Sequence, residues 1–123
     1  MNRKEELKAD YRQNWHKLRK MGVYQIKNQV NGKVFLEGSL NLDGTIARDQ
    51  TWLSRGGHLN HALQAEWNRF GSEAFTFDVL EMLSPTDDAR NYAEEVAILR
   101  EVWMEQLQPY GEQGYHPVPR RQG

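Results

Sequence analysis

Two histidines, His58 and His61, form the most metal-like pattern in the chain. They stand three residues apart near the start of a predicted helix, a spacing that can present two imidazole nitrogens to one ion. A metal site needs at least one further ligand, and no third ligand accompanies them at a suggestive spacing. The pair is therefore better explained as the polar start of a helix.

The common catalytic and nucleotide-binding motifs are absent from the sequence. It contains no Ser-His-Asp pattern, no P-loop and no Gly-x-Gly-x-x-Gly fingerprint. Because none of the 123 residues is cysteine, disulfides and thiolate metal sites are excluded, and we expect a cytoplasmic protein. No apolar run approaches the ~20 residues that span a bilayer, so we expect no membrane partner.

The net charge of −1 hides an uneven distribution. Residues 1–20 carry seven Lys and Arg against three acidic residues, whereas the rest of the chain carries nine against fourteen. A protein that clamps a phosphate backbone is usually basic on its working face, so the acidic remainder counts against strong nonspecific DNA binding. The basic segment could face phosphate, but a solvated helix face is the simpler interpretation.

The elements that must position any site begin with a predicted helix over residues 3–20. It places an apolar stripe of Leu7, Tyr11, Trp15 and Leu18 on an otherwise charged surface. Such a helix is marginal alone, so it would dock on the domain or on a protein partner.

A β-hairpin follows. Two β-favouring runs, Val23–Ile26 and Val34–Leu36, flank Asn31-Gly32, which is the strongest local hairpin signal.

Three further helices and one strand are expected after the hairpin. A weak helix covers residues 41–53, an amphipathic helix covers 60–70 and stops at Gly71, and a final helix follows Ser84-Pro85 to about residue 108. Residues 74–81 alternate apolar and polar side chains, which predicts a third strand. The fold class is therefore α+β, a three-stranded antiparallel sheet flanked by helices with an extra N-terminal helix.

Three segments carry a family resemblance. They are GVYQIKNQVNGKVFLEGS at 22–39, LNHALQAEWNRFGSEAFTFDVLE at 59–81 and LREVWMEQLQPYGEQGYHP at 99–117. Together they resemble the GIY-YIG nucleases, which cut phosphodiester bonds with one divalent metal ion. The resemblance divides the chain into a basic helix at 1–20, a GIY-YIG-like domain at 21–117 and a tail at 118–123.

The resemblance assigns roles to particular positions, and most of them have changed. Tyr24 matches the tyrosine that activates water, whereas Phe35 matches the second tyrosine without its hydroxyl. Thr45 stands at the arginine position and His116 at the terminal asparagine position. Glu37 replaces the motif glycine. A threonine offers phosphate neither charge nor a bidentate fork.

The metal position is changed as well. The alignment places Arg100 where the family has its glutamate ligand, and a cation there would repel Mg²⁺. The neighbouring Glu101 is rotated ~100° around the helix, and a one-residue slip would restore it as the metal ligand.

Two rearrangements could compensate for these losses. Arg48 lies one helical turn after Thr45 and could reach a phosphate, with Glu37 and Glu101 chelating a metal. Alternatively, Arg100 and Glu37 pair with each other and fill the old metal site.

The resemblance and these departures predict a nuclease-fold protein with a degenerate site, acting as a nucleic-acid-binding or regulatory module with DNA as its partner. One alternative is an active, divergent endonuclease that requires Mg²⁺. The other is a protein-interaction module that acts through the helix at 3–20.

Overall fold

The structure is a computed structural model that describes residues 3–6, 20–84 and 91–119. Most of the predicted helix over 3–20 lies outside the described residues, and its residues 3–6 are helical. Within the described part of the chain, no helix is long and apolar enough to cross a membrane.

A three-stranded antiparallel sheet forms the centre of the domain. Its strands are β1 (Met21–Asn28), β2 (Val34–Ser39) and β3 (Phe75–Leu83), in the order β2-β1-β3. The predicted hairpin pairs β1 with β2, and Tyr24 lies directly opposite Glu37. The predicted third strand adds to the other side of β1. The fold class predicted from the sequence is confirmed.

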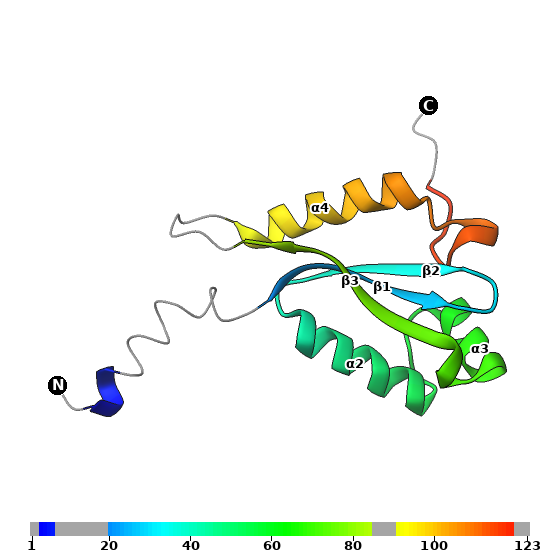
Figure 1. The fold of residues 1–123 in the computed structure, drawn as a ribbon, viewed down its shortest axis with the longest axis horizontal. Helices are drawn as coiled ribbons and strands as arrows, with labels where there is room; N and C mark the ends of the chain where they lie inside the picture. Colours follow the sequence, from blue (N-terminus) through cyan, green and yellow to red (C-terminus); the bar gives the residue numbers. More distant parts are fainter. Residues whose placement is uncertain (1–2, 7–19, 85–90, 120–123) are drawn as a thin grey trace.

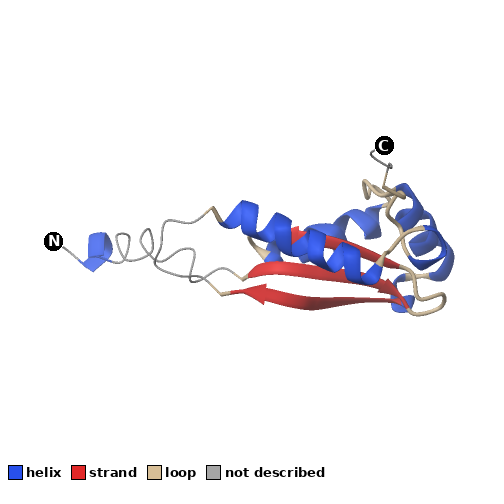
Figure 2. Ribbon diagram, turned by 90° about the horizontal axis from the view of Figure 1, so that it is seen from above, coloured by secondary structure: helices blue, strands red, loops and turns tan. Residues whose placement is uncertain are grey.

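Helices cover both faces of the sheet (Figures 1 and 2). On one face lies α4 (Tyr92–Leu107), and on the other lie α2 (Leu42–Arg55) and α3 (His61–Phe70). Because side chains alternate along a strand, Tyr24 and Glu37 point toward α2 and α3, whereas Gly38 faces α4. A Cβ on Gly38 would lie 2.8 Å from Val96 of α4. The close approach of α4 therefore depends on a glycine at position 38.

The main hydrophobic core lies between the sheet and the α2–α3 layer. Its buried members are Tyr24, Ile26, Leu42, Leu53, Leu63, Trp67, Phe75 and Tyr115.

Helix α2 is longer than its sequence predicts. It runs for 14 residues because the Asn41 side chain caps its start and Gly56 ends it in a left-handed conformation. Leu42, Asp49 and Leu53 are buried along one face, so tertiary packing offsets the poor helix propensity.

Helix α4 begins later than expected. It starts at Tyr92 with Asn91 as its cap, rather than directly after Ser84-Pro85. Residues 85–90 lie outside the described residues.

The segment after α4 packs against the outer edge of β2. The Tyr115 amide donates to the Val34 carbonyl at 3.1 Å, and the Leu36 amide donates to Nε2 of His116 at 2.8 Å. These two bonds use groups of β2 that point away from β1, and they bring His116 to the edge of the sheet. The sequence predicted irregular structure here, and a short 3₁₀ turn at Gly111–Gln113 is the regular element that forms.

Replacing Gly22 with alanine should destabilise the sheet. Its φ is 155°, and a Cβ would lie 2.0 Å from the Glu81 carbonyl oxygen in β3. We expect the free energy of unfolding, measured by urea denaturation, to fall by about 2–4 kcal/mol. The control Gly57→Ala, where a Cβ meets nothing within 4 Å, should leave it unchanged or raise it by up to about 1 kcal/mol. Equal effects of the two substitutions would contradict the backbone conformation at Gly22.

Candidate functional site around Tyr24

The hydroxyl of Tyr24 lies between two carboxylates. It is 2.7 Å from Oε2 of Glu37, the residue opposite it in β2, and it also hydrogen-bonds Oδ2 of Asp49 on α2. Tyr24 and Asp49 are fully buried, whereas Glu37 is partly exposed. The sheet register fixes the first contact, and the docking of α2 fixes the second.

This arrangement has a simple consequence for protons. A phenol carries one proton and can donate to only one of the two carboxylate oxygens at a time. Removing that proton would place a phenolate against two carboxylates, which is electrostatically unfavourable. The local structure therefore holds Tyr24 as a hydrogen-bond donor rather than as a base.

Arg48 neutralises part of the negative charge. Its Nη2 lies 2.5 Å from Oε1 of Glu37 and 3.2 Å from Oδ1 of Asp49, and its guanidinium stacks on Trp52 at 4.6 Å from the ring centroid. The side chain is 41% exposed, so it forms the solvent-facing side of the cluster. Two carboxylates against one guanidinium leave an excess of negative charge when both are ionised.

His58 closes the buried end of this cluster. Its Nδ1 accepts a hydrogen bond from the Asn60 amide at 3.0 Å, so in the neutral ring the proton resides on Nε2. Nε2 lies 3.3 Å from Oδ1 of Asp49, close enough for electrostatic attraction, but it makes no hydrogen bond with a described residue. It is a buried donor that lies beside an acidic residue.

A hollow of about 240 Å³ opens onto this cluster. Its walls combine aromatic rings with charged groups: Phe35, Glu37, Arg48, Asp49, Trp52, His58, Leu59 and Asn60.

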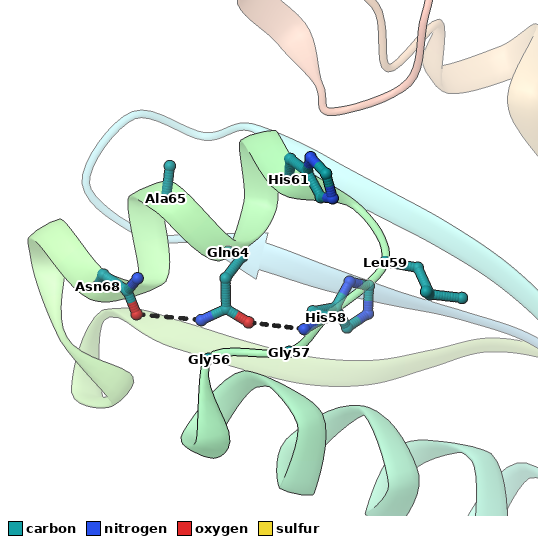
Figure 3. Close-up of a pocket in the computed structure, with 8 residues that line it drawn as sticks. All are labelled: Gly56, Gly57, His58, Leu59, His61, Gln64, Ala65 and Asn68. Atoms are coloured by element: carbon teal, nitrogen blue, oxygen red, sulfur yellow. Dashed lines mark hydrogen bonds between the residues drawn. The ribbon is translucent and has the colours of Figure 1, made fainter.

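A second hollow, of about 400 Å³, lies beside His58 and Leu59 (Figure 3). The Gln64 amide spans its floor, accepting from the His58 amide at 2.9 Å and donating to Asn68 at 3.0 Å. Gln64 also donates to the Leu53 carbonyl, so its polar atoms serve to hold the loop between α2 and α3.

Phe35 separates the Tyr24 cluster from His116. Its ring meets His58 edge-on at 5.4 Å and stacks on His116 at 5.0 Å. Burial, with a smaller effect from the charge of Arg100, lowers the pKa of His116 to about 4. The imidazole is therefore neutral at pH 7.

The residues singled out from the sequence fall into separate places. Tyr24, Phe35 and Arg48 gather around the hollow, and His116 stacks on the far side of Phe35. Thr45 instead bonds Ser39 at 2.6 Å, where it links β2 to α2. His61 is exposed at the start of α3.

The predicted ion pair between Glu37 and Arg100 is wrong. Glu37 pairs with Arg48, and Arg100 makes no ion pair with it. The reason is geometric: Glu37 faces the α2–α3 layer, whereas Arg100 belongs to α4 on the opposite face of the sheet.

The donor set does not fit a divalent metal at the expected position. Arg100 contributes a cation, and the neighbouring Glu101 is exposed on α4. Among the described residues, no three His, Cys, Asp or Glu side chains are grouped so that they could hold a metal ion.

Asp49 is the site residue that the sequence analysis missed. A signal was present, because Leu42, Ile46, Asp49 and Leu53 follow the spacing of one apolar helix face. A single acidic residue on such a stripe indicates a buried carboxylate with a polar partner.

Comparison with known proteins identifies the fold. No family model and no curated protein matches the chain. It is similar to the structure of the catalytic domain of the homing endonuclease I-TevI, at 24% identity and a TM-score of 0.67, over 80% of this chain and 99% of that one. The chain is also similar to a glutamate-to-alanine mutant of that domain, at 25% identity and a TM-score of 0.66, over 85% of this chain and 99% of that one. The chain therefore has the GIY-YIG nuclease fold.

Tyr24→Phe should lower the free energy of unfolding at pH 7 by about 1–3 kcal/mol, because it removes the donor shared by two carboxylates. Urea denaturation measures this loss. Tyr110→Phe is the matched control, since the Tyr110 hydroxyl makes no hydrogen bond with a described residue, and it should change stability by less than about 0.5 kcal/mol. If Tyr24→Phe left the free energy of unfolding unchanged, the Tyr24 hydroxyl would not make these two hydrogen bonds.

His116 should make stability depend on pH between about 4 and 6.5. Its pKa is about 4 in the folded chain and near 6.5 when unfolded, so in this window the unfolded chain binds more protons. Its contribution to stability is therefore present above pH 6.5 and is lost as the pH falls toward 4.

Unfolding free energies measured from pH 7 to pH 4 should fall less steeply in His116→Gln than in the unsubstituted protein. His61→Gln, at an exposed histidine, should keep the original slope. Identical slopes in all three proteins would show that His116 titrates normally in the folded state.

Proposed function

We propose that this nuclease-fold protein acts by binding nucleic acid and does not hydrolyse phosphodiester bonds by the GIY-YIG mechanism. The observation that carries the proposal is the enclosure of the Tyr24 hydroxyl by Glu37 and Asp49. A tyrosine held as a donor to two carboxylates is poorly suited to take a proton from an attacking water.

The charge around Tyr24 also opposes phosphate. Hydrolysis needs positive or hydrogen-bonding groups aimed at the charge that develops on phosphate. Here the two carboxylates outnumber the guanidinium of Arg48, which is already paired with both. Thr45 is engaged with Ser39 and offers no charge in place of an arginine.

Support for a nucleic-acid ligand comes from two directions. The similar structures are catalytic domains of an endonuclease, and residues 1–20 carry the chain's excess of Lys and Arg. The remainder of the chain is acidic, so we expect modest affinity that falls steeply with salt. The absence of cysteine favours the cytoplasm as the compartment.

A divergent endonuclease is the second candidate, because Arg48 and His58 border the same hollow as Tyr24's carboxylate partners. In that case Arg48 would have to exchange its partners for phosphate. A metal ion such as Mg²⁺ would then require ligands other than those of the family position, and Glu101 is the carboxylate nearest to it in sequence.

One pair of assays on the same DNA separates these candidates. Single- and double-stranded DNA is incubated with the protein and Mg²⁺ or Mn²⁺, and binding is measured by fluorescence anisotropy at several salt concentrations. We expect salt-dependent DNA binding without cleavage. The affinity for DNA should be the same in Tyr24→Phe and Glu101→Ala as in the unsubstituted protein.

Metal-dependent cleavage that is lost in Tyr24→Phe but kept in Tyr110→Phe would establish the endonuclease and overturn the proposal. The absence of both cleavage and binding would also overturn it, and would favour a protein-interaction module acting through residues 3–20.

A further inference from the structure

Arg100 is a partly buried cation on α4. It forms no ion pair with any described residue. A Cβ on Gly38 would lie 3.6 Å from the Cβ of Arg100, so the side chain starts directly beside β2. Glu37 is on the opposite face of the sheet, and Glu101 is exposed one position further around α4. A partly buried guanidinium of this kind is stabilised by an anion placed beside it.

The surroundings of Arg100 form a hollow of about 280 Å³. Apart from Arg100 its lining is small or apolar: Gly38, Ser39, Leu40, Ala93, Val96 and Ala97. A cation at the border of an apolar surface fits a ligand that combines a negative group with an apolar body, and a phosphate attached to a deoxyribose has this character.

His116 supplies a second donor at the same edge of β2. Its Nε2 accepts the Leu36 amide, so the proton of the neutral ring resides on Nδ1, which makes no hydrogen bond with a described residue. Stacking on Phe35 fixes the plane of the ring. Leu36 and Gly38, beside which His116 and Arg100 lie, are two residues apart on the strand.

The charge of Arg100 acts on His116. Its positive charge contributes, after burial, to the lowered pKa of the imidazole. A bound anion would screen this repulsion, and the imidazole then serves as a reporter of occupancy.

We propose that Arg100, with Nδ1–H of His116 as a second donor, binds a phosphodiester anion of a nucleic acid at the outer edge of β2. The guanidinium fork matches two phosphate oxygens, which an ammonium would not. The site lies where the family resemblance places a metal ligand, and it offers positive charge from the protein itself. The identity of the ligand as nucleic acid rests on the proposed function, whereas the anion site stands on its own geometry.

The first test uses inorganic phosphate alone. The imidazole resonances of His116 are followed by NMR while phosphate is added at constant ionic strength, with chloride and acetate titrations in parallel. We expect a saturable shift with phosphate, a weaker response to acetate and none to chloride. Arg100→Gln should weaken phosphate binding by about tenfold or more, whereas Arg100→Lys, which keeps the positive charge, should weaken phosphate binding less. Arg69→Gln, at an arginine stacked on Phe70, should match the unsubstituted protein.

Two results would overturn the site. One is a response to phosphate no larger than the response to chloride. The other is an unchanged response in Arg100→Gln, provided that the Leu36 amide resonance shows His116 still in place.

The second test measures DNA binding against salt. Arg100→Gln should reduce the slope of log K against log[salt] by about 1, and Arg69→Gln should not change it. DNA binding with an unchanged slope in Arg100→Gln would remove this inference and leave the proposed function intact. Phosphate binding at Arg100 with no DNA binding by any variant would keep the site and remove the proposed function.

Discussion

The central strand β1 is paired on both edges and covered on both faces, and the placement of every other element follows from this. Met21, Val23, Tyr24 and Ile26 are all fully buried. Because β2 and β3 both register against β1, the alternation of side chains is passed to the whole sheet. Alternate residues along each strand are thereby directed to opposite faces of the sheet. The Tyr24 cluster belongs to one layer, and the residues beside α4 belong to the other.

A buried polar network attaches the C-terminal segment to this framework. Asn28, at the end of β1, is fully buried and donates to the Tyr115 hydroxyl at 3.2 Å and to Glu66 of α3 at 3.1 Å. Burial, together with the hydrogen bond to Glu66, raises the pKa of Tyr115 well above its ordinary value. Lys33 balances Glu66 at 3.3 Å. Because the network is satisfied on every side, it fixes Tyr115, and the adjacent His116 is thereby held against Phe35 and the Leu36 amide.

The two sides of the sheet carry charges of opposite sign. Two carboxylates surround the tyrosine on the α2–α3 side, and an arginine without an acidic partner among the described residues stands on the α4 side. Negative charge at Tyr24 disfavours phosphate, and positive charge at Arg100 favours it. In our proposal, a phosphate backbone is held at the edge of β2 and away from the tyrosine.

The sequence by itself determined the order of the strands and helices from Met21 onward. Asn31-Gly32 marked the hairpin, alternation after Ala74 marked the third strand, and Gly71 marked the end of a helix, because turns, caps and periodicity are encoded within a few residues. The spaced motifs were likewise sufficient to predict the fold, and they singled out Tyr24, Phe35 and Arg100 as candidate site residues. Only the tertiary structure decided which of these residues meet. The sequence predicted an ion pair between Glu37 and Arg100. In the structure these two residues lie on opposite faces of the sheet, and Glu37 instead contacts Arg48 and Tyr24. Asp49 reached Tyr24 because α2, weak in helix propensity, is stabilised by burial against the sheet. Such contacts join residues far apart in the chain, so they depend on how layers dock, and no local pattern records that.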